Sequence, residues 1–150
     1  MRIEVKLIAV ALLVLAFGVL PAQAQYSEIY RLDKAVSGLE DKVVLTKFSE
    51  KLGVASETLA QQKTEQNLSF GQLYMAHALA KATNKDFATI MSQIKSGKTW
   101  SLVARENNVR MQPISVTVRD LEKNLKKERA TATTAKGSKT STGLNSKSSN

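Results

Sequence analysis

The chain of 150 residues contains no cysteine, and it contains one histidine, one tryptophan and two prolines. The absence of cysteine excludes a disulfide framework, zinc or iron–sulfur sites with cysteine ligands, a thiol nucleophile and a lipid-modified cysteine anchor. A single histidine excludes metal sites built from several histidines. The length suits one small domain. These shortages remove many chemistries before any motif is considered.

Residues 1–24 have the pattern of a secretory signal peptide. Two basic residues lie near the start, and an apolar run of 14 residues follows at positions 7–20. This run is shorter than the roughly 20 residues that a membrane-spanning helix needs. Residues 21–24, Pro-Ala-Gln-Ala, supply a helix breaker and an Ala-x-Ala cleavage site. We therefore expect cleavage after Ala24 and a periplasmic or extracellular protein, with a retained apolar anchor as the alternative.

Positive charge gathers toward the C-terminal end of the chain. The formal net charge is +9, and residues 119–150 hold eight bases against three acids. Within this region, residues 130–150 are nearly half serine and threonine, with Leu144 as the one large apolar residue. Such a segment cannot bury enough apolar surface to offset its ordering entropy. We therefore expect residues 130–150 to form a disordered, solubilising tail.

The remaining residues, 25–129, predict an all-α domain. Apolar residues recur at helical spacing, whereas no stretch shows sustained alternation of apolar and polar residues. We expect a compact bundle of about six to seven short helices. Helix-starting and helix-ending residues place these helices at 26–38, 41–52, 56–65, 69–82, 86–97, 99–107 and 113–129.

The helix that begins at Ser69 is expected to be central. Gln72 follows Ser69 by three residues, which is a capping-box pattern. Apolar residues occupy nearly every side of this helix, and such a helix is usually buried. The flanking helices show one apolar stripe each, for example Ile90, Met91 and Ile94, or Val118, Leu121 and Leu125.

A weak internal repeat relates two helix-turn-helix-like corners. Residues 48–59 and 103–114 align at a constant offset, and an apolar residue, Val54 or Val109, follows each turn. That apolar residue is expected to fill the angle between two helices. Two copies are too few to indicate a solenoid.

Residues 99–125 resemble the helix-turn-helix of bacterial transcription regulators with a winged-helix domain. The resemblance implies base-reading positions at Met111, Gln112, Ser115 and Arg119, of which one is basic. No strand pair follows to form a wing, and an exported protein has no promoter to contact. Nucleic-acid binding through this unit and the basic C-terminal region is therefore the alternative hypothesis. The shared apolar positions are Val103, Ala104, Val109, Ile114, Val118 and Leu121.

Residues 48–112 are similar to a group of small secreted bacterial helical proteins. The shared pattern has Phe-Gly at the start of a central helix, then a Thr-Asn-Lys-x-Phe turn, then Gly-Lys-x-Trp followed by Val-Ala. These elements are Phe70-Gly71, residues 83–87 and residues 97–104. The group has no assigned activity, so the resemblance implies a helical fold and export and adds no catalytic residue.

Catalytic patterns are weak. Residues 96–99, Ser-Gly-Lys-Thr, match the end of a phosphate-binding loop, but Ser92 stands where that loop needs glycine and a helix, not a strand, is expected before it. His77 has no acid three or four residues away. We expect it to be partly buried and bonded to a backbone carbonyl or a tyrosine. A hydrolase built on His77 is the third and least favoured hypothesis. The carboxylates show no pair or calcium-loop spacing.

The last expected helix is amphipathic and basic on its outer side. This pattern is typical of docking to an anionic partner or a membrane surface, and also of a merely solvated face. We expect a non-enzymatic exported protein, without metal or cofactor, that contacts an envelope protein or an anionic polymer. Peripheral membrane contact and the oligomeric state stay open, and nucleic acid is disfavoured. The candidate contact residues are Arg119, Lys123, Lys126, Lys127 and Arg129.

Overall fold

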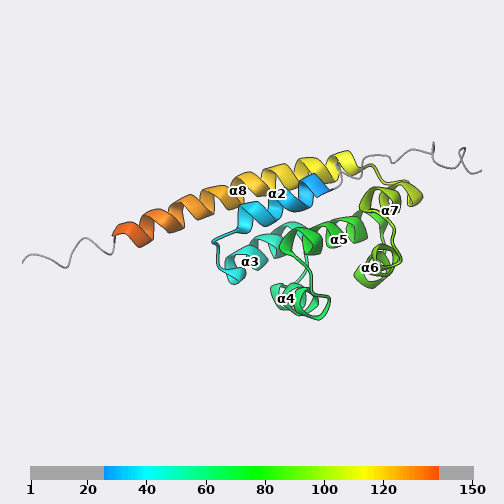
Figure 1. Cartoon of the computed structure of the whole chain (residues 1–150), viewed down its shortest axis with the longest axis horizontal. Coiled ribbons are helices and arrows are strands. Elements are labelled where there is room, and N and C mark those ends of the chain that lie inside the picture. Colours follow the sequence, from blue (N-terminus) through cyan, green and yellow to red (C-terminus); the bar gives the residue numbers. More distant parts are fainter. Residues whose placement is uncertain (1–25, 139–150) are drawn as a thin grey trace, which may run out of the picture.

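The computed structural model describes residues 26–138 as seven helices joined by short corners (Figure 1). The helices are α2 (Tyr26–Val36), α3 (Asp41–Leu52), α4 (Ser56–Glu65), α5 (Phe70–Thr83), α6 (Phe87–Lys95), α7 (Trp100–Glu106) and α8 (Met111–Ser138). No strand occurs within these described residues, so the prediction of an all-α bundle is confirmed. The expected signal peptide and residues 139–150 of the expected tail lie outside the described residues.

The helix α5 forms the centre of the bundle, as its sequence predicts. It packs against α2, α3, α4, α6 and α7. Phe48 of α3 meets Phe70 and Tyr74 of α5 edge to face, with ring centroids 6.0 and 5.0 Å apart. Burial of each large apolar side chain stabilises the fold by about 1.5–3 kcal/mol. The fully buried large side chains of α5 are Leu73, Tyr74, Met75 and Leu79.

The start of α5 crosses α2 at very short range. A Cβ atom placed on Gly71 would lie 2.4 Å from the carbonyl oxygen of Ile29, so only glycine permits this approach. The backbone N–H of Gly71 donates to Asp33 Oδ1 of α2 at 2.7 Å. Asp33 thereby satisfies an amide at the N-terminus of α5, where a negative charge is also favoured by the helix dipole.

All six connections between successive helices have the same construction. A residue with positive φ stands three positions before the first residue of the next helix, at Gly38, Gly53, Asn67, Asn84, Gly97 and Asn108. At four of the corners the next amide donates five residues back and closes a Schellman motif; the donors are Leu68, Lys85, Lys98 and Val109. The two helix-turn-helix-like corners expected from residues 48–59 and 103–114 are present, at Gly53 and Asn108, and the other four connections share their backbone geometry.

Most helix starts match the predicted caps. Asp86 and Thr99 accept hydrogen bonds from Thr89 and Leu102, and the capping box at Ser69 is complete. The helix α4 has the expected bounds, but the sequence also suggests Ser56 as its cap, whereas Ala55 is the N-cap and no side chain caps it. Ser56 is instead the first helical residue.

The helix α8 is longer than expected. Residues 111–138 form one continuous helix that runs past Arg129, so the helix includes the first part of the segment predicted to be a tail. The hydroxyls of Thr131, Thr133 and Thr134 donate to carbonyls one turn earlier, at 2.8–3.3 Å. These bonds satisfy the threonine hydroxyls within the helix, which explains how a serine- and threonine-rich stretch continues it.

The first and last described helices, α2 and α8, lie side by side and run in the same direction (Figure 1). Ser115 of α8 donates to Glu28 of α2 at 3.0 Å, and Arg129 donates to the carbonyl of Lys34 at 3.3 Å. The buried stripe of α8 is Ile114, Val118, Leu121 and Leu125, as predicted. No helix within residues 26–138 has the length and apolar composition to cross a membrane.

Candidate anion-contact face

Exposed charge is divided unevenly over the described surface. On α2 and α8 six cations are exposed against one acid, Asp120. Between them, over residues 37–110, seven exposed cations face seven exposed acids. The excess of fully exposed cations therefore lies on α2 and α8, although residues 37–110 also carry a positive net charge, with ten cations against seven acids. We call the exposed cationic side chains of these two helices the α2–α8 face; they are Arg31, Lys34, Arg119, Lys123, Lys126 and Lys127.

The acids of α2 and α8 are mostly turned toward neighbouring helices. Glu122 is 16% exposed, and Glu128 forms an ion pair with Lys47 of α3 at 3.6 Å. Glu28 is half-buried between α2 and α8 and Asp33 lies at the start of α5. Glu28, Asp33 and Glu128 thus bind groups of the fold outside the face, whereas Glu122 pairs with Lys126 of the face at 2.6 Å.

Glu28 keeps its charge inside the contact between α2 and α8. Burial works against its ionisation, but hydrogen bonds from Ser27 and Ser115 and the nearby charge of Arg31 outweigh burial, so the pKa of Glu28 lies below its ordinary value. The hydrogen bonds measure 2.7 Å from Ser27 and 3.0 Å from Ser115. Glu28 is therefore a carboxylate whose two oxygens each accept a hydrogen bond inside the contact between α2 and α8.

Four of the five predicted contact residues are exposed on α8. Arg119 and Lys127 make no hydrogen bond or ion pair through their side chains to the described residues. Lys123 lies 3.7 Å from Asp120 and Lys126 lies 2.6 Å from Glu122, pairs along one exposed helix side that contribute little stability. Arg129 is different, because it is half-buried and donates to the end of α2.

The sequence analysis missed the part of this face that α2 contributes. Tyr30 and Lys34 are one turn apart and lie opposite the buried Leu32. Arg31 is also exposed on α2. The apolar stripe of α2 could have indicated which of its residues point outward, but not that α8 would lie beside it.

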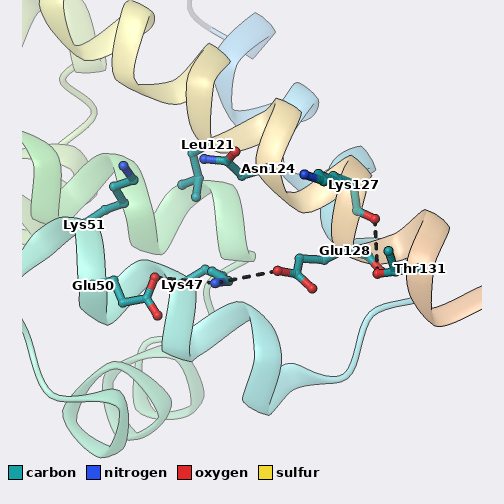
Figure 2. A pocket seen from close by; sticks show the side chains of 8 residues that line it. All are labelled: Lys47, Glu50, Lys51, Leu121, Asn124, Lys127, Glu128 and Thr131. Carbon is teal, nitrogen blue, oxygen red and sulfur yellow. Dashed lines mark hydrogen bonds and ion pairs between the residues drawn. The ribbon is translucent and has the colours of Figure 1, made fainter.

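A shallow groove separates α8 from α3 (Figure 2). Its volume is about 370 Å³, and Leu121 is the one apolar residue in its lining. Lys47 lies between Glu50 and Glu128, 3.6 Å from each, so this cation is neutralised locally. Lys51 and Lys127 have no such partner. The lining is Lys47, Glu50, Lys51, Leu121, Asn124, Lys127, Glu128 and Thr131, a mainly polar and charged set.

His77 is a buried core residue. It is 7% exposed, its Nε2 lies 2.7 Å from Gln62 Oε1, and its ring stacks on Phe87 with centroids 4.6 Å apart. Burial lowers the pKa of His77 to about 4. The predicted hydrogen-bonded histidine is confirmed, although its partner is a side-chain amide and not a backbone carbonyl or a tyrosine. The ring joins α4, α5 and α6 and has no carboxylate to orient it.

Two further motifs have structural roles. Gly97 and Thr99, in the segment that resembles a phosphate-binding loop, form the corner after the helix α6, and Lys98 pairs with Glu106 at 2.6 Å. Of the four base-reading positions implied by the helix-turn-helix resemblance, Met111 packs on the core and Ser115 bonds Glu28. Within residues 26–138 no three side chains of metal-ligating type gather.

No protein-family model, no curated protein and no solved structure matches the chain.

Proposed function

We propose that this chain is a non-enzymatic interaction protein that is exported by residues 1–24 and contacts an anionic partner through the α2–α8 face. The observation that carries the proposal is the charge distribution. Six exposed cations and one exposed acid lie on α2 and α8, whereas exposed charges balance over residues 37–110. Attraction between such a face and an anionic surface raises the rate of encounter and weakens with salt.

The lack of a chemical constellation on this face supports a binding role. Its charged side chains are lysines and arginines, and the histidine of the chain, His77, lies in the core and not on this face. Lysines in solvent, beside other cations and without a desolvating pocket, are contact groups rather than activated nucleophiles.

The experiment places a photo-crosslinking residue at position 123 of the face, and at position 58 on α4 as the matched control. Both positions are exposed. We expect crosslinking to an envelope component at position 123, and we expect it to fall steeply between low and high salt. Equal crosslinking from both positions, or none from position 123 at low salt, would contradict the proposal.

A further inference from the structure

We propose that the α2–α8 face docks flat on a bilayer of anionic lipid. This inference rests on the proposed function and names the partner. The three observations behind it are the exposed cations, the exposed apolar side chains on the same two helices, and the length of α8 together with the arrangement of α2 beside it.

Charge complementarity is the first observation. Arg31, Lys34 and Arg119 are exposed and make no side-chain hydrogen bond or ion pair to the described residues. Lys123 and Lys126 are paired only with acids on their own helix. Cations held near an anionic bilayer each strengthen partitioning about fivefold. The outward side of α2 and α8 therefore carries enough cations for an attraction of two or more orders of magnitude.

The exposed apolar residues are the second observation. Among the described residues, the two exposed large hydrophobic side chains are Tyr30, at 65%, and Val116, at 48%. Tyr30 lies on α2 beside Arg31, and Val116 lies on α8 within one turn of Arg119. A tyrosine among cations suits the boundary of a bilayer, because its ring enters the apolar zone while its hydroxyl stays hydrated.

Shape is the third observation. The helices α2 and α8 run side by side in the same direction, and α8 has 28 residues (Figure 1). At the usual rise of 1.5 Å per residue, α8 is about 42 Å long. The 11-residue α2 lies along α8 between Ser115 and Arg129, so the two helices together present an elongated strip that can lie against a surface. The strip fits the groove of a nucleic acid less well, since two of the four implied base-reading residues are engaged inside the molecule.

The test is co-sedimentation with vesicles. It uses the protein as it is purified from the expressing cells, without any further truncation. Phosphatidylglycerol–phosphatidylcholine vesicles are compared with vesicles of phosphatidylcholine alone. The face variant combines Arg31→Gln, Lys34→Gln and Arg119→Gln. The control variant combines Lys42→Gln, Lys85→Gln and Arg105→Gln, which removes the same charge from exposed positions elsewhere. Both variants share the N-terminal and C-terminal segments, so those segments cannot produce a difference between them.

We expect wild type to bind the anionic vesicles only, and binding to fall at high salt. The face variant should bind at least about tenfold more weakly, while the control variant stays within about threefold of wild type. Tyr30→Ser should weaken vesicle binding severalfold without changing any affinity for duplex DNA. Far-ultraviolet circular dichroism and the fluorescence of Trp100 confirm that each variant is folded.

Equal weakening in the face and control variants would overturn the inference, as would no binding to anionic vesicles. Binding to duplex DNA alone, lost in the face variant, would assign the face to nucleic acid instead. If vesicles fail and crosslinking at position 123 to an envelope protein persists, the lipid assignment falls while the proposed function stands. If both experiments fail, both proposals fall.

Discussion

The helices α2 and α5 approach closely at Gly71, a residue with no side chain to hold them apart. Its amide is held by Asp33 and its Cα faces the carbonyl of Ile29. The sequence shows Phe70-Gly71 at a helix start but not what lies against it, because Ile29 is distant in the chain. Caps, in contrast, depend on residues within three positions, and those at Ser69, Asp86 and Thr99 were predicted from the sequence.

Replacing Gly71 with alanine should destabilise the fold by about 1–3 kcal/mol, because the added methyl group meets backbone that cannot rotate away. The matched control is Ala82→Gly at an exposed position of the same helix. At position 82 the change to glycine should lower the free energy of unfolding by about 0.5–1 kcal/mol. Urea unfolding measures both values, and a stabilising Gly71→Ala substitution would contradict the described crossing.

The buried imidazole of His77 should make stability depend on pH. Its pKa is about 4 in the folded protein, whereas the unfolded value is near 6.5. The unfolded chain therefore binds the proton first as pH falls, so stability is greatest above pH 6.5, declines toward pH 4 and then levels. Between pH 7 and pH 5 the loss should be on the order of 1–2 kcal/mol.

His77→Gln removes this titration and retains a polar group near Gln62. Urea unfolding at pH 7 and pH 5 should show a smaller decline for the variant than for wild type. The same variant should keep the crosslinking at position 123. A hydrolase built on His77 would instead lose its activity while the fold is retained, which would revive that hypothesis.

At the scale of elements, all six connections between helices contain one residue with positive φ, whereas the internal repeat in the sequence indicates only two of them. The positive-φ residue is glycine at Gly38, Gly53 and Gly97 and asparagine at the other three corners. An alignment of apolar positions detects only those corners whose flanking residues happen to match. The shared requirement is a backbone angle, which glycine and asparagine meet in different ways.

Asn84 tests this requirement. Asn84→Ala should destabilise the fold by about 1 kcal/mol, since alanine tolerates a φ of 52° poorly, and Asn84→Gly should be neutral or slightly stabilising. The control is Asn124→Ala in the exposed part of α8, where alanine should gain a few tenths of a kcal/mol. Thermal unfolding of the three variants measures their stabilities relative to wild type. An equal loss of stability in Asn84→Ala and Asn124→Ala would contradict the prediction.

The length of α8 shows where composition misleads. Low apolar content after Arg129 predicts that the segment gains little by packing, and residues 131–134 are indeed exposed. Extending an existing helix, however, needs no new nucleus, and alanines together with back-bonded threonines allow the extension. The part of α8 that packs on the core therefore determines that the exposed residues after Arg129 are also helical.

At the scale of the whole molecule, sequence alone located the excess of charge near the C-terminus but not its full extent. Four of the five residues predicted on α8 are joined by Arg31 and Lys34 of α2, because the fold sets these helices side by side, whereas Arg129 is used to hold α2. Which helices become neighbours depends on packing across the core. The sequence therefore predicts which residues point outward more reliably than which outward residues share a face.

Export is the prediction that belongs to the intact chain. Mass spectrometry of the protein recovered outside the cytosol should give an N-terminus at Gln25, because cleavage is expected after Ala24. A full-length species with Met1 in the membrane fraction would support a retained anchor instead. A full-length species associated with DNA inside the cell would support the regulator hypothesis.

The pairing of α2 with α8 also constrains the order in which the molecule assembles. Ile29 and Leu32 are buried by partners that follow α2 in the chain, and Ser115 and Arg129 lie 87 and 95 residues after their partners Glu28 and Lys34. The contacts between α2 and α8 can therefore form only after the helices α3 to α7 have been synthesised. Until α8 arrives, α5 is the main packing partner of α2, so part of the apolar side of α2 stays accessible to chaperones.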